Sequence, residues 1–570
     1  MISFDGRPVP AQPGQTVAAA LWAAGIRTWR STRGGAARGL FCGIGACHDC
    51  LATIDGRPSQ RACLVEARSG MTVESNHSET APEGNQGGAL ATTREQGPEF
   101  RFGLPASGAS ADIAVVGAGP AGLAAAATAA LADRRVVLVD AAPRAGGQFW
   151  RHPEGADGHG HRDWRVFEGL ISIVDDRADH LPDATVWFAE TVPGGFRLHT
   201  TAGEVRADRV VLATGAHDRA LPFPGWELPG VVTPGAAQAL LKGSGVSVGR
   251  RVVVAGAGPF LLPVAVGLAE AGVRVVAVVE AGEPSTYLRR PGVLAGAAGK
   301  LTEAAGYAVA LSRRRIPYLV RHAVVAAYGV GKVSHVDVVR LDQQGKAMSG
   351  SRRRLDCDAV AVGYGFTANL ELALALGCRT VRGADGSLAV EVDADGATSS
   401  AGVWAAGEIT GVGGSSLAVV EGILAGAAAT AAGGGPPAQS VRDLALLRRR
   451  RGRLRAFAEV MHAAHAIPAG WPAWLGEQTL VCRCEEVTFG RLRHAVAELG
   501  AGDARTVKLL ARPGMGWCQG RICGYPTAAL TAGLCGRDVT DADLAAFAHR
   551  PFAAAVRLDD LAADRAAPIE

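Results

Sequence analysis

The chain has 570 residues, a formal net charge of +4 and 48% hydrophobic residues. This length allows three or four domains with sizeable cores, and so small a net charge gives no reason to invoke nucleic acid or an anionic membrane as a partner. Residues 1–7 lack the features of a signal peptide, and the apolar stretches near 252–280 and 417–433 are interrupted by glycine or charge. We therefore expect a cytoplasmic protein without an integral membrane segment.

The N-terminal region predicts a small β-rich domain that carries four cysteines. Cys42, Cys47, Cys50 and Cys63 have the spacing C-x4-C-x2-C-x12-C, which matches the plant-type [2Fe–2S] pattern. A structural zinc site is the alternative. Zinc sites prefer paired C-x2-C knuckles, and this segment holds one such pair.

A dinucleotide-binding turn follows a stretch rich in Ser, Thr, Glu, Gly and Pro. Gly117, Gly119 and Gly122 form G-x-G-x-x-G between an apolar strand over 113–116 and an Ala-rich helix. The start of that helix would bind a pyrophosphate, and Asp140, which ends the next strand, would bind the adenosine ribose. A nucleotide fold that binds AMP alone, or nothing, is the alternative, because a helix N-terminus accepts any phosphate.

Three further segments complete the predicted FAD site. Residues 141–148 (A-A-P-R-A-G-G-Q) resemble the glycine turn beside the flavin in two-dinucleotide-domain flavoproteins, and 211–215 and 405–408 resemble two other markers of that class. Glu408 stands where an aspartate usually holds the ribityl chain, and the helix after 413–416 would direct its positive end at the flavin. The residues expected to bind FAD are Gly117, Gly119, Pro120, Ala121, Gly122, Asp140, Gly147, Gln148, Val192, Thr214, Gly215, Gly407 and Glu408.

A second strand–turn–helix–strand unit begins at residue 251 and predicts a second nucleotide-binding fold inserted in the first. Gly256 and Gly258 are present, but Leu261 replaces the third glycine, which hinders close helix packing over a pyrophosphate. Glu280 favours NAD over NADP if either binds. A structural domain is favoured here over a working NAD(P) site.

His217 and Asp218 follow the first domain's Ala-Thr-Gly strand. They are interpreted as a hydrogen-bonded loop pair rather than as groups near the flavin. The Arg-rich run 448–455 is interpreted as a solvated helix face rather than a docking site for an acidic partner.

The C-terminal region carries a second set of four cysteines, Cys482, Cys484, Cys518 and Cys523, spaced C-x-C-x33-C-x4-C. The spacing resembles the bacterioferritin-associated-ferredoxin-like [2Fe–2S] module, and zinc is the alternative. The chain has no cysteine between Cys63 and Cys357, which argues against disulfide reductase chemistry at the flavin.

With these motifs, nearly the whole chain resembles the α-subunit family of multi-subunit amine and amino-acid dehydrogenases. That family includes opine oxidase, hydrogen cyanide synthase, D-hydroxyproline or proline dehydrogenase and, more distantly, sarcosine oxidase. The anchors are 213–226, 230–238, 249–262 and 362–366, and residues 39–50 resemble the small ferredoxin-like subunit of those systems, here fused to the chain.

The resemblance implies that a separate flavoprotein β-subunit, similar to D-amino-acid oxidase, oxidises the C–N bond. This chain would then relay electrons through FAD and two [2Fe–2S] clusters to a one-electron acceptor. It leaves open whether FMN lies at a subunit interface, and no catalytic residue is assigned. The alternatives are a self-sufficient NAD(P)H-dependent reductase and a non-enzymatic iron–sulfur scaffold.

The expected fold is α/β: a two-dinucleotide-binding-domain flavoprotein, one Rossmann-like fold inserted in another, between an N-terminal β-grasp ferredoxin-like domain and the C-terminal cluster module. The expected boundaries are 1–80 for the ferredoxin-like domain, 81–110 for a linker, 111–240 and 356–432 for the FAD-binding domain, 241–355 for the inserted domain, 433–475 for a linker and basic helix, 476–536 for the C-terminal [2Fe–2S] module and 537–570 for a tail.

Overall fold

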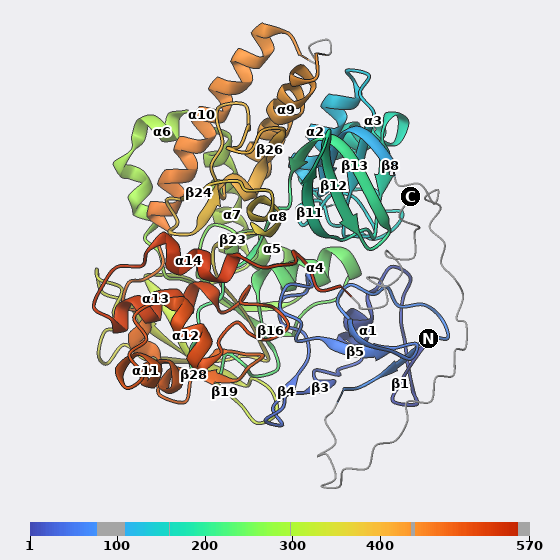
Figure 1. The fold of residues 1–570 in the computed structure, drawn as a ribbon. Helices are drawn as coiled ribbons and strands as arrows, with labels where there is room; N and C mark the ends of the chain where they lie inside the picture. Colours follow the sequence, from blue (N-terminus) through green and yellow to red (C-terminus); the bar gives the residue numbers. More distant parts are fainter. Residues whose placement is uncertain (77–108, 159, 297, 435–438, 557–570) are drawn as a thin grey trace.

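The structure is a computed structural model that describes residues 1–76, 109–158, 160–296, 298–434 and 439–556 (Figure 1). Most of the expected linker at 81–110 and the end of the expected tail at 537–570 lie outside the described residues.

The N-terminal domain is a five-stranded mixed sheet with one helix packed on it. Strands β1 and β7 are parallel, and the neighbouring pairs are antiparallel. Helix α1 (Val17–Ala23) is almost wholly buried, and the Thr16 side chain caps it by accepting from the Ala19 N–H. The strands in sheet order are β2 (Arg7–Val9), β1 (Ile2–Phe4), β7 (Thr72–Glu74), β5 (Leu51–Ile54) and β6 (Arg57–Arg61), with β3 (Arg30–Ser31) and β4 (Ala37–Arg38) beside them.

The first nucleotide-binding domain is built on a seven-stranded sheet whose parallel strands carry the predicted βαβ unit. The late strand β26 (Val403–Ala405) pairs in parallel with β13 and returns the chain to this sheet, as predicted. The other strands in order are β10 (Asp179–Leu181), β9 (Val136–Val139), β8 (Ala109–Val116), β13 (Gly203–Leu212), β12 (Gly195–Thr200) and β11 (Val186–Val192).

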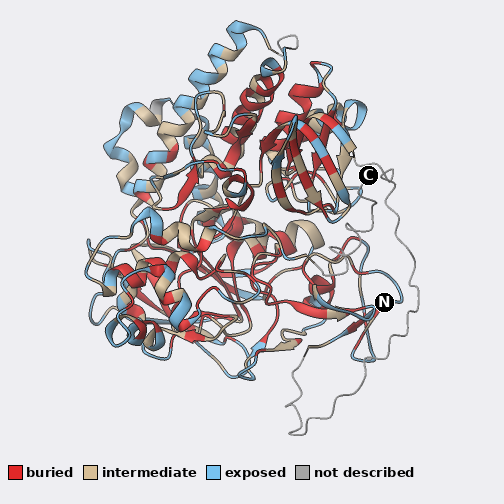
Figure 2. Ribbon diagram, in the orientation of Figure 1, coloured by how far each residue is buried: buried red, intermediate tan, exposed pale blue. Residues whose placement is uncertain are grey.

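Helices α2 (Pro120–Ala130) and α9 (Ser415–Ala432) pack together against this sheet (Figure 1). Their contact is close: a Cβ at Gly422 would lie 2.1 Å from the Ala121 carbonyl oxygen. Helix α9 is long and apolar enough to span a membrane, but most of it is buried in the interior (Figure 2). Helix α3 (Trp164–Arg177) also packs against α2.

The inserted domain has a second parallel sheet of five strands. The sheet includes β15 and β22, which lie outside the expected boundaries 241–355. The chain instead crosses between the two domains through the antiparallel pair β14 (Ala216–Asp218) and β23 (Phe366–Ala368). The strands in order are β15 (Val231–Val232), β22 (Ala359–Tyr364), β16 (Arg251–Ala257), β17 (Arg274–Glu280) and β18 (Tyr318–Val320).

Short helices and small sheets surround these two domains. The helices of the inserted domain are α4 (Pro234–Ser244), α5 (Leu261–Glu270), η1 (Pro284–Arg289), α6 (Pro291–Ala295) and α7 (Ala298–Arg313). A three-stranded sheet holds β19 (His322–Tyr328), β20 (His335–Arg340) and β21 (Arg353–Asp356). After β23 come α8 (Glu371–Ala375), the pair β24 (Thr380–Arg382) and β25 (Leu388–Val390), and η2 (Gly407–Thr410).

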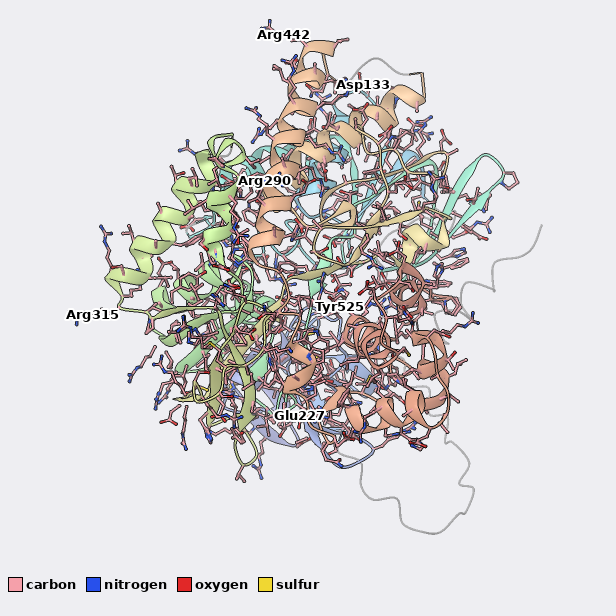
Figure 3. The ribbon with its side chains drawn as sticks, turned by 90° about the vertical axis from the view of Figure 1, so that its left-hand side faces the viewer. Asp133, Glu227, Arg290, Arg315, Arg442 and Tyr525 are labelled. Atoms are coloured by element: carbon pink, nitrogen blue, oxygen red, sulfur yellow. The ribbon has the colours of Figure 1, made fainter. Side chains whose placement is uncertain are left out.

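The C-terminal region begins with the long helix α10 (Val441–Ala464), which extends outward to Arg442 (Figure 3). The region ends in a small helical unit that includes the half-buried Tyr525, whose ring centroid lies 4.6 Å from the Arg219 guanidinium carbon. The elements of this unit are η3 (Trp471–Trp474), β27 (Leu480–Cys482), β28 (Val487–Thr488), α11 (Phe489–Ala497), α12 (Ala504–Ala511), α13 (Gly524–Leu534) and α14 (Asp541–Ala548).

Candidate functional site

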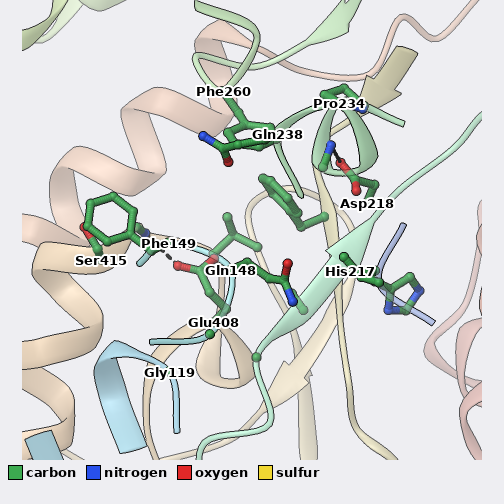
Figure 4. Close-up of a pocket in the computed structure, with 18 of the residues that line it drawn as sticks. Gly119, Gln148, Phe149, His217, Asp218, Pro234, Gln238, Phe260, Glu408 and Ser415 are labelled. Carbon is green, nitrogen blue, oxygen red and sulfur yellow. Dashed lines mark hydrogen bonds between the residues drawn. The ribbon is translucent and has the colours of Figure 1, made fainter. Parts of the chain in front are cut away.

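A large cavity of about 1550 Å³ opens at the start of α2. Its lining residues come from the N-terminal domain, both nucleotide-binding domains and the C-terminal unit. Pockets for drug-sized ligands usually measure about 300–1,000 Å³, so this one has room for a dinucleotide. Figure 4 shows part of its wall, with Gly119, Gln148 and Glu408 on one side and Phe260 and Gln238 on the other.

The predicted glycine turn leads into α2 and forms this part of the cavity wall. Gly117 lies in the left-handed region (φ 104°), and a Cβ at Gly122 would stand only 1.7 Å from the Gly117 carbonyl oxygen. Both positions therefore require glycine. Pro120 occupies the first turn of α2, and its fixed φ suits that position. The backbone at the start of α2 is left free to bind a phosphate.

Asp140 lies at the end of β9 and accepts hydrogen bonds from the Ala118 and Ala142 N–H groups, both at 3.2 Å. Burial raises the pKa of its carboxyl to about 6. The position at the end of the second strand, beside the glycine turn, is the one expected for a carboxylate that binds an adenosine ribose.

Gly147 and Gln148 also line the cavity, and the Gly147 backbone (φ 59°) lies so close to Gly119 that a Cβ would be 2.8 Å from its Cα. Two of the residues expected to bind FAD do not line the cavity: Gly122, which lies inside α2, and Val192. Val192 ends β11, where it pairs with Gly195 in a hairpin.

Thr214 and Gly215 follow β13 and are fastened to the loop before α8. The Thr214 hydroxyl donates to the Asn369 carbonyl oxygen, and the Asn369 amide donates back to Thr214 O, both at 2.8 Å. Asn369 also bonds His217 Nδ1 at 2.9 Å. His217 and Asp218 are buried and line the cavity, but they do not bond each other as a pair. His217 Nε2 lies 2.9 Å from Arg521 O, and Asp218 accepts from Thr233 and Gly235.

Gly407 and Glu408 follow β26, and Glu408 turns toward the start of α9. Its carboxylate accepts from the Gly414 N–H at 2.7 Å and from the Gly413 N–H at 3.4 Å, and burial raises its pKa. The positive end of α9 therefore faces a carboxyl group of the protein itself, that of Glu408. Ser415 begins α9 beside it and also lines the cavity (Figure 4).

The second glycine turn has a different environment. Gly258 and Leu261 line the cavity, but Glu280 is 1% exposed. Its carboxylate accepts from the Gly258 and Gly282 N–H groups, and His465 Nδ1 lies 3.1 Å from it. The residue that would bind an NAD ribose is therefore turned into the protein and covered by the segment after α10.

In the first cysteine set the thiols fall into two hydrogen-bonded pairs, Cys42 with Cys47 and Cys50 with Cys63, and all four are buried. Among the residues that the structure describes, no group of metal-ligating side chains converges on a single ion. Four buried cysteines with this spacing suit a [2Fe–2S] cluster.

The second cysteine set is also gathered. Cys484 Sγ lies 3.7 Å from Cys482 Sγ and 3.9 Å from Cys518 Sγ, and Cys523 bonds Cys482. A Cβ at Gly516 would be 2.6 Å from Cys484 Sγ, so the backbone passes close to the sulfurs. The sulfur atoms of the four residues thus lie close together, and Cys484 is the most exposed of them.

Both cysteine loops reach the cavity. Gly45 and Cys63 line it from the first set, and Arg521 lines it from between Cys518 and Cys523. Cys63 is the one cysteine among the described lining residues, so the cavity wall carries no cysteine pair.

Three side chains at or near the cavity were not predicted from the sequence. Lys242 on α4 donates to Phe149 O, and burial lowers its pKa to about 8. Arg151 lies within electrostatic reach of Asp140 and Cys63, and burial lowers its pKa. Asn369 bonds both Thr214 and His217. None belongs to a motif, because their positions depend on contacts between distant segments.

The arginine run on α10 is only partly a solvated face. Arg451 and Arg455 turn inward to Glu421 of α9, at 2.9 and 2.7 Å, and Glu421 is 3% exposed. Arg448 follows the prediction: it pairs at the surface with Asp395.

Comparisons with known proteins agree with this geometry. Residues 1–78 match the family of 2Fe-2S iron-sulfur cluster binding domains, and residues 111–433 match the pyridine nucleotide-disulphide oxidoreductases. The A subunit of opine oxidase from Agrobacterium tumefaciens is 32% identical over 481 residues, which cover 79% of this chain and 91% of that protein. The HcnB subunit of hydrogen cyanide synthase from Pseudomonas aeruginosa is 32% identical over 435 residues, covering 72% and 90%.

Two further matches concern the N-terminal domain and the whole fold. The HcnA subunit of hydrogen cyanide synthase from Pseudomonas aeruginosa is 49% identical over 73 residues, covering 13% of this chain and 70% of that protein. The crystal structure of L-proline dehydrogenase from P. horikoshii aligns with a TM-score of 0.70 and 20% identity, covering 98% of this chain and 96% of that one.

The fold and these matches define an FAD-binding oxidoreductase with an N-terminal [2Fe–2S] domain. Within that class, the chain belongs to the family that contains the A subunit of opine oxidase and the HcnB subunit of hydrogen cyanide synthase. The relationship expected from the motifs is thereby confirmed.

Proposed function

We propose that this chain is the electron-transfer subunit of a multi-subunit dehydrogenase that acts on the CH–NH or CH–NH2 group of an amine, amino acid or opine. The observation that carries the proposal is the shared cavity: one wall is the dinucleotide turn, and both cysteine loops reach the same space. FAD would be held by Gly117–Gly122, Asp140, Gly147 and Thr214. When bound, FAD takes up two electrons and releases them singly to iron–sulfur clusters.

The second part of the proposal concerns the C-terminal cysteines, which would hold a second [2Fe–2S] cluster. Their four sulfurs lie together, and the loop around them is rich in glycine, which suits close backbone packing around an inorganic core. Arg521, between two of these cysteines, places this loop against His217 in the cavity wall.

A partner subunit would carry the amine-oxidising site. The relatives are themselves subunits by name. We expect the partner to be a cytoplasmic flavoprotein similar to D-amino-acid oxidase, and a one-electron carrier to be the acceptor. Co-purification from the native source tests this: a second flavoprotein should accompany the chain, and flavin analysis of the complex shows whether FMN is bound besides FAD.

A self-sufficient NAD(P)H-dependent reductase is the alternative function. The buried Glu280 and its contact with His465 count against it, because they remove the ribose-binding carboxylate from the cavity. Anaerobic mixing with NADH separates the two functions. We expect NADH not to bleach the flavin on the time scale on which the complex turns over its amine substrate. Rapid bleaching would overturn the proposal.

Cys518→Ser tests the role of the second cysteine set, with Cys535→Ser as the matched control, because Cys535 is half-buried outside both sets. C518S should lose one of two EPR signals of the reduced protein and slow the reduction of an artificial acceptor, while FAD remains bound. C535S should change neither. If C518S oxidises its flavin at the wild-type rate, the second set is structural.

A further inference from the structure

We propose that a buried ion pair between Asp49 and Arg483 fixes the position of the two cysteine loops relative to each other. The same pair holds the N-terminal domain in one position on the C-terminal unit. The inference deepens the proposed function, because it rests on the two loops binding clusters.

The ion pair links two residues that each lie between cysteines of their loop. Asp49 stands between Cys47 and Cys50, and Arg483 stands between Cys482 and Cys484. The Arg483 Nε and one terminal nitrogen lie 2.8 and 2.7 Å from Asp49 Oδ2. The two side chains are 6% and 2% exposed, so the pair is almost completely removed from water.

Arg483 also contacts the inserted domain. Its other terminal nitrogen donates to Trp226 O at 2.7 Å. Its guanidinium lies 4.1 Å from the Phe41 ring and 5.0 Å from the Trp226 ring. The Trp226 indole N–H in turn donates to Leu480 O at 2.7 Å. One side chain of the C-terminal unit therefore contacts both the N-terminal domain and the inserted domain, through the planar fork of its guanidinium.

A second set of contacts fixes the same interface. The Glu486 carboxylate accepts from the Thr32 hydroxyl at 2.7 Å and from the Gly34 N–H at 2.9 Å. The buried Arg38 lies 4.0 Å from Glu486 and donates to Arg483 O at 3.5 Å. Glu486 is a non-glycine residue at φ 51°, a conformation that persists only where the surroundings hold it.

The chemistry of this contact indicates positioning rather than stabilisation. A buried ion pair gains little over a well-packed apolar pair, but it tolerates only one geometry, and removing one partner leaves a buried charge unpaired. The function that fits is to fix the spacing between two bound clusters. With clusters bound by the two cysteine loops, the pair would hold the two loops at the fixed distance that one-electron transfer between them requires.

Two variants, Asp49→Asn and Arg483→Lys, test the proposal on the full chain with its cofactors. The first readout is EPR of the dithionite-reduced protein. Wild type should show magnetic interaction between two clusters, and both variants should lose it while iron content stays unchanged. The matched control is Asp395→Asn, which removes the exposed pair with Arg448 and should leave the spectrum as in wild type.

The second readout is hydrogen–deuterium exchange of residues 30–38 and 483–488, which does not depend on clusters. Exchange should be at least about tenfold faster in both variants, since the contact opens locally. Unchanged exchange and unchanged magnetic interaction in both variants would overturn the inference. Wild-type protein without iron would instead overturn the proposed function, and the exchange rates would still decide the role of the pair.

Discussion

Gly122 determines how close α2 lies to the glycine turn, so its replacement is the sharpest test of the FAD site at the scale of single residues. In Gly122→Ala the new Cβ would meet the Gly117 carbonyl oxygen at 1.7 Å, and the turn must move. Such overpacking costs about 1–3 kcal/mol, so we expect FAD to bind roughly 10- to 100-fold more weakly. The measurement is flavin content per chain after dialysis.

The control for that variant is Gly169→Ala, on the helix α3, where a Cβ would have nothing within 4 Å. It should keep its flavin and lose no stability, because alanine is the better helix former. If G122A retained as much flavin as G169A, the dinucleotide would not lie on this turn.

Asp140 makes FAD binding depend on pH. Its pKa is raised to about 6 by burial, so the carboxyl gains a proton below that pH and no longer offers a charged acceptor to ribose hydroxyls. FAD affinity should fall as the pH drops, by about tenfold at pH 5. Fluorescence titration of the apoprotein measures this. Asp140→Asn should bind weakly at every pH, whereas Asp218→Asn, at a cavity carboxyl with a similar pKa, should keep the wild-type profile.

Single residues were predictable where a local pattern defines them. Gly117, Gly122 and Asp140 lie where the strand–turn–helix pattern puts them. Val192 does not, since no motif supports it and its strand ends in a hairpin. The burial of Glu280 beside the second glycine turn could not be predicted either. His465 contacts Glu280 only because α10 ends next to it.

At the scale of elements, the packing of α10 on α9 depends on Glu421. This carboxylate is 3% exposed and bonds Arg451, Arg455 and the Gly407 N–H. We expect Glu421→Gln to destabilise the protein by about 2–4 kcal/mol, because two arginines lose their partner. Asp395→Asn should cost at most about 1 kcal/mol, since its arginine is exposed. Equal shifts in urea midpoints would contradict this account.

The elements of the two βαβ units were predictable because apolar runs alternate with glycine turns. The point where one domain enters the other was not. Strands β14 and β15 are two or three residues long, and β22 is an apolar, wholly buried strand, as the central strands of the first sheet are. Only pairing assigns them to a sheet.

At the scale of the whole molecule, the sequence indicates each module but not how the modules meet. The central feature is that the first glycine turn and both cysteine loops line one cavity. The two loops are also connected by the ion pair between Asp49 and Arg483. These contacts connect segments from opposite ends of the chain, and no local pattern encodes them.

An anaerobic titration of the purified chain with dithionite, followed by optical and EPR spectroscopy, tests the central claim most directly. The account predicts uptake of about four electrons, two by FAD and one by each [2Fe–2S] cluster. Uptake of about three electrons, two by FAD and one by the N-terminal cluster, with zinc in place of iron at the C-terminal cysteines, would contradict it.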